Sequence, residues 1–329
     1  MKVIVTGGAG FIGSHLAERL LKEKKITSII ILDHFKDGSF ANIKSFFKNK
    51  KIRVVKKNIC NIKKNELVFK NVHCVFHLAA IADIVPSIEN PFEYCNNNFT
   101  GTLKILEAMR YHNIKKIIYA ASSSCYGIPK KYPTDEKENI ATIYPYAFSK
   151  YVAELAIIHW AQVYKINYIS LRLFNVYGLR SRTTGAYGAV MGIFLKQKLS
   201  NKPLTLVGDG QQKRDFINVI DVADAFVVAF KSKRLNQIYN IGASKPIKII
   251  ELIKILKSKF VKIEKRPGEP QLTFANILKA KKYLKWSPKI NFTNGINDLV
   301  ENIQYWKKAP LWNKQSISRS TKAWFKHLK

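Results

Sequence analysis

Residues 3–13 read Val-Ile-Val-Thr-Gly-Gly-Ala-Gly-Phe-Ile-Gly, and this stretch decides the fold. Its first residues form a short apolar run typical of a buried strand, and residues 11–22 then show the apolar spacing of a helix. Gly7, Gly10 and Gly13 lie at the turn between the two. Glycines at such a turn let the backbone approach a pyrophosphate at the helix N-terminus. The stretch therefore predicts a dinucleotide-binding strand–turn–helix unit.

An acidic residue follows at the position where a dinucleotide presents its adenosine ribose. Asp33 ends the apolar run 29–32, about 20 residues beyond Gly13. Its carboxylate can accept hydrogen bonds from the ribose hydroxyls and would repel a 2′-phosphate, which favours NAD over NADP. We expect the other cofactor contacts of the turn and of the strand ends from Phe11, Ile12, His34, Asn58, Ile59, Leu78, Ala79 and Ala80.

Short apolar runs alternate with helical periodicity through the first half of the chain. This alternation predicts an α/β fold, a doubly wound parallel sheet of the Rossmann-like kind. The expected strands cover residues 3–6, 29–32, 52–55, 74–78, 116–120 and 168–173, and the expected helices cover 11–22, 98–111 and 146–164.

Beyond about residue 176 the alternation becomes irregular, which suggests a second unit. We expect an NAD-binding Rossmann domain over residues 1–175, to which residues 217–240 return. A smaller α/β C-terminal substrate domain is expected over residues 176–310. The basic tail, residues 311–329, could be an appended helix or a frayed end, and the sequence leaves both open.

A tyrosine and a lysine four residues apart supply acid–base chemistry. Tyr146 and Lys150 in YAFSK project from one helix face, and Pro145 suits the first turn of that helix. A nearby ammonium should lower the pKa of Tyr146 from its ordinary value near 10, so the phenol can serve as a general base toward an alcohol or carbonyl. The spacing alone is common in ordinary amphipathic helices. It gains weight from the glycine turn and from the serine run at residues 122–124.

The net charge of +34 is extreme for 329 residues. It indicates either a polyanionic partner or a composition biased toward lysine. The lysine clusters are short, scattered and free of any nucleic-acid-binding motif, so we favour the bias and expect no nucleic-acid partner. A positive field would still steer an anionic sugar diphosphate inward.

The chain shows no pattern of a metal site, a disulfide framework or a membrane protein. Its four cysteines have no C-x-x-C spacing, which predicts reduced thiols and no metal. The first residues lack the pattern of a signal peptide, and no apolar run is long enough for a membrane span. We therefore expect a cytoplasmic protein.

Taken in order, the motifs resemble a known family. They are similar to those of the extended short-chain dehydrogenase/reductase superfamily, in its branch of nucleotide-sugar epimerases and dehydratases, and closest to the UDP-glucose and UDP-N-acetylglucosamine 4-epimerases. The resemblance covers about residues 1–305. Beyond the glycine turn and YAFSK, it rests on HLAA at 77–80, SSSCYG at 122–127, LRLFNVYG at 171–178, VGDGQQKRDFINVIDV at 207–222 and RPGE at 266–269.

The resemblance implies a role for individual residues. Ser122, Tyr146 and Lys150 would be catalytic, and all three would also contact the cofactor. Asn98 would bind near the nicotinamide. The implied substrate-binding residues are Ser123, Ser124, Asn175, Arg214, Arg266, Glu269 and Thr273.

Among the substrate residues, the resemblance implies that Arg214 and Arg266 bind a diphosphate. The planar guanidinium group suits this role because it can donate two parallel hydrogen bonds. Glu269 would accept from the uridine ribose, and the small Thr273 would admit an N-acetyl group at C2 of the sugar. Other roles stay open. Arg214 could instead form an ion pair with Asp215 or Asp209, and the hydroxyls of residues 123–124 could simply bond within their loop.

The implied activity is NAD-dependent interconversion of nucleotide sugars at C4 through a transient 4-keto intermediate, on a UDP-hexose or UDP-N-acetylhexosamine. The main alternative is a lyase, either a 4,6-dehydratase or a decarboxylase. Similar lyases carry an acidic residue just after the catalytic hydroxyl, whereas Ser123 and Ser124 carry no carboxylate. A non-catalytic NAD-binding protein is a weaker alternative, because it would not need Tyr146 and Lys150.

The resemblance also implies a homodimer, formed through the helices at about 98–111 and 147–164. The apolar residues Leu103, Leu106, Ala153 and Ile157 on those helices could equally be covered by the sheet. The sequence departs from the usual pattern of the family at three places. Asn58 replaces a common Asp, Ala82 replaces a Lys found in some 4-epimerases, and Gly188-Ala189 replaces an Asn that helps to hold the diphosphate in some members.

Overall fold

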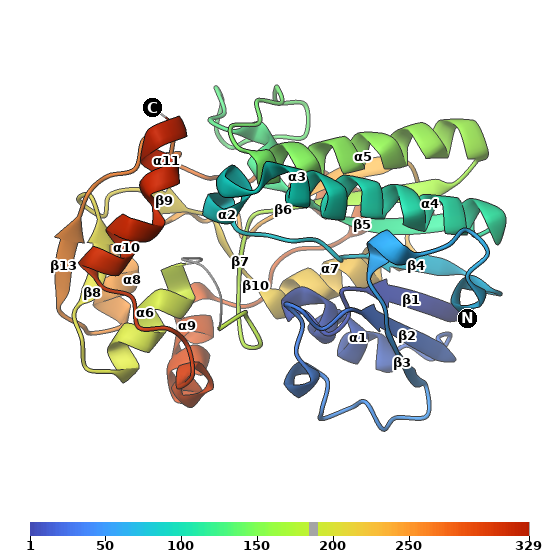
Figure 1. Ribbon diagram of the computed structural model, residues 1–329, viewed down its shortest axis with the longest axis horizontal. Coiled ribbons are helices and arrows are strands. Elements are labelled where there is room, and N and C mark those ends of the chain that lie inside the picture. Colours follow the sequence, from blue (N-terminus) through green and yellow to red (C-terminus); the bar gives the residue numbers. More distant parts are fainter. Residues whose placement is uncertain (184–189, 329) are drawn as a thin grey trace.

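A seven-stranded sheet forms the centre of the described chain, residues 1–183 and 190–328 of the computed structural model (Figure 1). Every strand pair in this sheet is parallel, and the order is β11-β6-β5-β4-β1-β2-β3. The expected doubly wound α/β fold is therefore confirmed. The strands are β1 (Lys2–Thr6), β2 (Ser28–Asp33), β3 (Ile52–Lys56), β4 (Cys74–His77), β5 (Lys116–Ser122), β6 (Asn167–Leu173) and β11 (Gln237–Ile241).

Helices cover both faces of this sheet, which explains why its strands read as continuous apolar runs. In β1, Val3, Ile4 and Val5 are fully buried. Helix α1 (Phe11–Leu21) packs against α7 (Val219–Lys231) on one face, and α4 (Gly101–Tyr111) packs against α5 (Pro145–Tyr164) on the other (Figure 1). The strand order reverses between β1 and β4. In open α/β sheets, ligands bind beyond the carboxyl ends of the strands at such a reversal.

One helix begins differently from the prediction. The segment expected as a helix over residues 98–111 starts with a π-helical turn, Asn96–Thr100, before α4. A π-turn inserts one extra residue per turn and rotates the residues before it relative to the α-helix that follows. The side chains of residues 96–98 therefore point in directions that a regular helix would not predict.

A smaller unit lies beside the carboxyl edge of the sheet and has its own apolar core (Figure 1). Strand β8 (Leu204–Val207) pairs in parallel with β13 (Phe260–Ile263), and helices α6 (Val190–Leu199), α8 (Ile249–Ile255) and α9 (Phe292–Glu301) surround them. Two short pairs connect the units: β7 (Asn175–Tyr177) with β10 (Phe216–Asn218), and β9 (Lys213–Arg214) with β12 (Ile247–Lys248). After β10 the chain returns through α7 to β11 in the main sheet.

The C-terminal tail forms two short helices, α10 (Lys314–Ser320) and α11 (Lys322–His327), which answers the question that the sequence left open. Asn313 caps α10: its side chain accepts from the Ser316 N–H, and the Ser316 hydroxyl accepts from the Asn313 N–H. Helix α11 packs against α2 (Ile84–Glu89), which belongs to the sheet-containing part of the chain. Among the described residues, no helix has the length and apolar character that crossing a bilayer requires.

Candidate active site

The glycine turn brings three elements into close contact. Gly7 has φ +67°, and a Cβ built there would lie 2.8 Å from the Ala79 nitrogen after β4. A Cβ on Gly13 would lie 2.1 Å from the Gly7 oxygen. A side chain at either position would clash with the backbone, so only glycine lets the β1–α1 turn approach both α1 and the end of β4.

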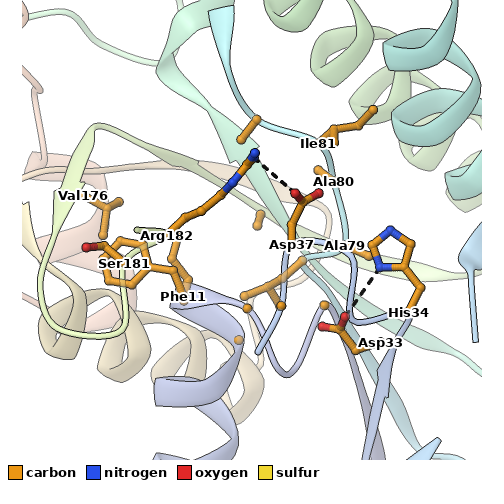
Figure 2. Close-up of a pocket in the computed structure, with 18 of the residues that line it drawn as sticks. Phe11, Asp33, His34, Asp37, Ala79, Ala80, Ile81, Val176, Ser181 and Arg182 are labelled. Carbon is orange, nitrogen blue, oxygen red and sulfur yellow. Dashed lines mark ion pairs between the residues drawn. The ribbon is translucent and has the colours of Figure 1, made fainter. Parts of the chain in front are cut away.

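A cavity of about 370 Å³ opens above this turn, at the reversal of strand order. In Figure 2, Asp33 from the end of β2 and Ala79–Ile81 after β4 lie on one side of it, and Phe11 from the start of α1 lies with Val176 and Ser181 on the other. Most of the predicted cofactor residues line this cavity: Gly7, Gly10, Phe11, Ile12, Gly13, Asp33, His34, Asn58, Ile59, Leu78, Ala79 and Ala80.

The end of β2 meets the requirements of a ribose-binding carboxylate. Asp33 is buried, its Oδ2 accepts from the Ala9 N–H at 3.0 Å, and its Oδ1 accepts from the Phe35 N–H at 2.8 Å. Each carboxylate oxygen can accept more than one hydrogen bond, so capacity remains for ribose hydroxyls. Together with the glycine turn at the N-terminus of α1, these residues fit a dinucleotide.

Asn58, the departure from the common Asp, caps a short turn at the adenine end. Its Oδ1 accepts from the Cys60 N–H at 2.9 Å, and the side chain lines the cavity. An asparagine performs this capping as well as an aspartate does.

An ion-pair bridge crosses the cavity, and no sequence motif indicated it. Arg182 lies 3.2 Å from Asp37 and 2.8 Å from Asp83, and Figure 2 shows its side chain reaching toward Asp37. All three residues line the cavity. Burial raises the pKa of Asp83 to about 6, while the charge of Arg182 opposes the rise. These residues come from distant segments, and only the fold brings them together.

Asn98, which was expected near the nicotinamide, is held by protein groups on several sides. Asn98 is buried, its Nδ2 donates to the Ile81 oxygen and to Ser149 Oγ, and its Oδ1 accepts from the Ile81 N–H. Its side chain does not line the cavity, whereas that of Asn97 does. Asn98 instead ties the loop after β4 to the helix that carries Tyr146.

A directed chain of hydrogen bonds supports the cavity from behind. The hydroxyl of Thr102 donates to the Asn98 carbonyl at 2.5 Å, so it accepts from His77 Nε2 at 2.9 Å. His77 Nδ1 then accepts from the Thr6 hydroxyl at 2.8 Å, which in turn receives the Leu78 N–H. Burial lowers the pKa of His77 to about 3, which keeps the ring neutral. His77 is thus a packed strand histidine and part of the scaffold.

The catalytic residues predicted from the sequence meet at the start of α5. Tyr146 is hydrogen-bonded to Ser122 at the end of β5. Ser122 Oγ lies 2.7 Å from Ser124 Oγ and also accepts the Ser124 N–H. The ring of Tyr94 meets the Tyr146 ring edge-on at 6.5 Å. These residues and Lys150 lie outside the lining of the cavity described above.

The expected lowering of the Tyr146 pKa is wrong for the protein's own groups. Burial raises this pKa, the hydrogen bond to Ser122 lowers it, and the charge of Asp83 raises it. Burial lowers the pKa of Lys150 itself to about 7, although the charge of Glu154 opposes that fall. The ammonium lies 4.2 Å from the centre of the Tyr119 ring, an arrangement that favours its charged form.

A buried ion pair lies one helical turn beyond Lys150. Glu154 Oε2 lies 2.7 Å from Arg172 Nη2, and Glu154 also accepts from the Ser170 hydroxyl. Arg172 donates to the Tyr126 hydroxyl at 3.0 Å, which fixes the turn that follows the serine run. Nothing in the sequence motifs marked Glu154 as a partner of Arg172. The pair holds α5, β6 and the serine segment in one arrangement.

The predicted substrate residues form two groups in the smaller unit. Arg214 Nη2 lies 2.7 Å from Glu269 Oε1, and Arg266 Nη1 lies 3.8 Å from Glu269 Oε2. The ion-pair partner of Arg214 is therefore Glu269, while Asp215 accepts backbone N–H groups of residues 243, 244 and 275.

In the second group, the hydroxyl of Thr273 donates to Asn175 Oδ1 at 2.8 Å and accepts from the Asp215 N–H. Thr273 is thus anchored to the strand end that carries Asn175. The substitution at Gly188-Ala189 lies outside the described residues.

Tyr144 connects the two halves of the site, and the sequence motifs did not single it out. It immediately precedes α5. Its pKa is raised by burial first, and then by the charges of Tyr146 and Glu269, while Arg214 lowers it. Tyr144 therefore lies within electrostatic range of Tyr146, the predicted catalytic base, and of the ion-paired Arg214.

Comparisons with known proteins agree with this arrangement. A relative in Thermodesulfobacterium geofontis, the UDP-glucuronate 4-epimerase, is 33% identical over 331 residues, covering 95% of this chain and 96% of the relative. The UDP-N-acetylglucosamine 4-epimerase of Methanobrevibacter ruminantium, solved with UDP-N-acetylmuramic acid, matches with a TM-score of 0.86 and 30% identity, over 93% of this chain and 98% of that one.

The UDP-glucuronic acid 4-epimerase of Bacillus cereus, solved with UDP-glucuronic acid and NAD, matches with a TM-score of 0.86 and 31% identity, over 92% of this chain and 99% of the other. The model of the NAD dependent epimerase/dehydratase family matches residues 3–242. Its range includes the glycine turn, Asp33, the serine run and the Tyr146–Lys150 pair. The chain belongs to the NAD dependent epimerase/dehydratase family, and NAD is its cofactor.

Proposed function

We propose that this protein is an NAD-dependent 4-epimerase of UDP-sugars, which interconverts them through a transient 4-keto intermediate. The observation that carries the proposal is the hydrogen-bonded series from Tyr146 through Ser122 to Ser124. It places three hydroxyl groups in a row, and none of them is a carboxylate. Such a set can take one proton from an alcohol and return it without touching neighbouring carbons.

In this mechanism Tyr146 accepts the proton of the C4 hydroxyl and later returns it. Ser122 donates to the oxygen that is losing its proton and so stabilises the developing charge. Lys150, poised with a pKa of about 7, can carry a charge beside the reacting group or release a proton. Bound NAD supplies the acceptor and donor of hydride at C4.

The lyase alternative needs an acid or base at a neighbouring carbon. Ser123 and Ser124 cannot supply it at neutral pH. Asp83 is the carboxylate whose charge reaches Tyr146, but it is ion-paired to Arg182. We therefore favour epimerisation, in which no proton bound to carbon is exchanged with solvent.

The substrate is proposed to be a UDP-hexose or a UDP-N-acetylhexosamine. The names of the relatives support UDP as the nucleotide, since both solved neighbours carry UDP-sugars. Arg214 and Arg266, gathered by Glu269, offer two guanidinium groups for a diphosphate. The small side chain of Thr273 supports acceptance of an N-acetyl group at C2.

We also propose a homodimer, through a face that differs from the one first expected. Leu106, Ala153 and Ile157 are buried beneath α4 and α5, and Leu103 packs against the same core. The outer faces carry other exposed apolar residues: Tyr111 on α4, and Phe148, Leu155 and Val163 on α5. Two copies that pack these faces together would bury them.

The test is a panel of UDP-glucose, UDP-glucuronic acid and UDP-N-acetylglucosamine, each incubated with the purified protein in deuterated water and followed by NMR. The expected product is the C4 epimer of at least one of them, with no deuterium on carbon. Deuterium at C5, or loss of water or carbon dioxide, would identify a lyase instead. Tyr146→Phe should lower turnover by about 10²–10⁴-fold, with the unfolding temperature retained. The control Tyr151→Phe, on the next turn of α5, should stay near the wild-type rate.

A further inference from the structure

The C-terminal tail reaches the loop that carries the predicted diphosphate clamp. Trp324 on α11 is buried, and its indole Nε1 donates to the Pro267 oxygen at 2.6 Å. Pro267 lies between Arg266 and the two residues that end the loop, Gly268 and Glu269. The tail thus holds the backbone of this loop directly, although it lies outside residues 3–242 that the family model matches.

The same indole also lies close to two further side chains, one in the loop and one before α5. The guanidinium carbon of Arg266 lies 5.7 Å from the centre of the Trp324 ring, within the range of a cation–π interaction. On its other side, the Trp324 ring lies 6.3 Å from the ring of Tyr144, which precedes the catalytic helix. Trp324 therefore lies where the arginine of the clamp meets the start of α5.

The loop has reasons to need such support. Gly268 has φ +67°, a conformation that is easily adopted only by glycine, and so the loop backbone has more freedom to lose on ordering. Arg266 loses side-chain entropy when it is fixed on a ligand, because its long side chain has many rotamers to lose. A ring that already holds the guanidinium, together with a hydrogen bond to the adjacent carbonyl, would reduce that cost before substrate arrives.

We propose that Trp324 is a positioning residue for nucleotide binding: α11 presets Arg266 and its loop for the diphosphate of the substrate. This inference rests on the proposed function, because it takes the loop as the nucleotide-binding segment. It assigns a role to a segment for which the sequence motifs indicated none.

The experiment measures binding of UDP by calorimetry and the steady-state constants for the active UDP-sugar, all on the full-length protein. For Trp324→Ala we expect the Kd of UDP and the KM of the UDP-sugar to rise about tenfold, with kcat changed less than about threefold, because the affected contacts do not touch the reacting carbon. NAD binding should be unchanged. Trp324→Phe keeps an aromatic ring but loses the indole N–H, so its Kd for UDP should lie between those of the wild type and Trp324→Ala. Lys326→Ala, exposed on the same helix, is the matched control and should resemble wild type.

A double-mutant cycle separates positioning from general stability. If Trp324 acts through Arg266, then Arg266→Ala and the double variant with Trp324→Ala should bind UDP with nearly equal affinity. Fully additive losses, or unchanged UDP binding by Trp324→Ala, would overturn the proposal. The proposal would also be overturned if Trp324→Ala lost UDP and NAD binding equally and had a lowered unfolding temperature, while Trp324→Phe bound UDP like the wild type.

The outcome is distinguishable from that of the proposed function. The UDP-binding measurement tests the inference without any turnover. The inference therefore survives even if the protein proves to be a lyase of UDP-sugars. Absence of UDP binding by the wild-type protein would overturn the inference, whatever reaction the protein catalyses.

Discussion

Arg214 Nη2 lies 2.7 Å from Glu269 Oε1, which joins two residues that are 55 positions apart in the chain. Arg266 approaches the other oxygen of the same carboxylate at 3.8 Å. The carboxylate offsets the repulsion between two guanidinium groups and holds them near each other. A substrate diphosphate would therefore meet two cations that are already gathered.

Replacing Glu269 with Gln should weaken nucleotide binding more than chemistry. The amide keeps the shape of the side chain but no longer offsets the two positive charges. We expect the KM for the UDP-sugar to rise about tenfold with kcat within about threefold, measured by steady-state kinetics. Glu264→Gln, exposed nearby, provides the control. A fall in kcat at unchanged KM would place Glu269 away from the nucleotide.

Ser122→Ala should affect both the rate and its pH dependence. Loss of the hydroxyl removes a hydrogen bond that lowers the pKa of Tyr146. The acidic limb of the rate profile should therefore move to higher pH, and kcat should fall about 10²-fold. Ser123→Ala should change neither property appreciably. A larger effect at Ser123 than at Ser122 would reassign the catalytic hydroxyl.

Asp83→Asn should move the acidic limb in the opposite direction. The charge of the Asp83 carboxylate raises the pKa of Tyr146, and the pKa of Asp83 itself is about 6, so this influence is present above about pH 6. Without the charge, Tyr146 loses its proton more easily, and the limb should shift to lower pH. The measurement is kcat/KM across the pH range, with Glu89→Gln as the control. A shift toward higher pH would contradict the assignment.

Leu155→Asp should abolish the proposed dimer. Leu155 is 44% exposed on the outer face of α5, and a carboxylate there would have to be desolvated on association. Light scattering should then report a monomer at concentrations where the wild-type protein is a dimer. Ile220→Asp, at a position that is 50% exposed on α7, should leave the mass unchanged. The proposed face is wrong if both variants remain dimeric.

Much of the sheet could be predicted from local sequence alone. The strands of the first half are short, largely apolar runs, and every expected strand lies in the sheet within two residues at either end. The glycine turn could also be predicted from the sequence. At Gly7 and Gly13 any residue with a Cβ would clash with the neighbouring backbone, so glycine is required there.

The features of the site that the sequence did not predict depend on contacts between distant segments. Arg182 forms ion pairs with Asp37 and Asp83, which are distant in the sequence, and no residue spacing predicts these contacts. The direction of the Tyr146 pKa depends on burial and on Asp83, which no Tyr–Lys pattern contains.

Two segments depend on features that local sequence patterns do not reveal. Asn98 was expected to contact the cofactor because of the family resemblance, which carries no information on the π-helical turn before α4. The helices of the tail are seven and six residues long, too short to be stable alone, so tertiary contacts such as that of Trp324 decide their form.

The chain of hydrogen bonds through His77 has a further consequence. Every proton in it has one assigned direction, and the Thr6 hydroxyl would have to stop donating to His77 Nδ1 before the ring could accept a second proton. Since its pKa is about 3, the cellular range of pH does not reach it. Acidification toward about pH 6 therefore protonates Asp83 at one side of the cavity while the support beneath it stays electrically silent. Mild acidification thus changes a charge in the lining of the cavity and leaves the hydrogen bonds beneath it in place.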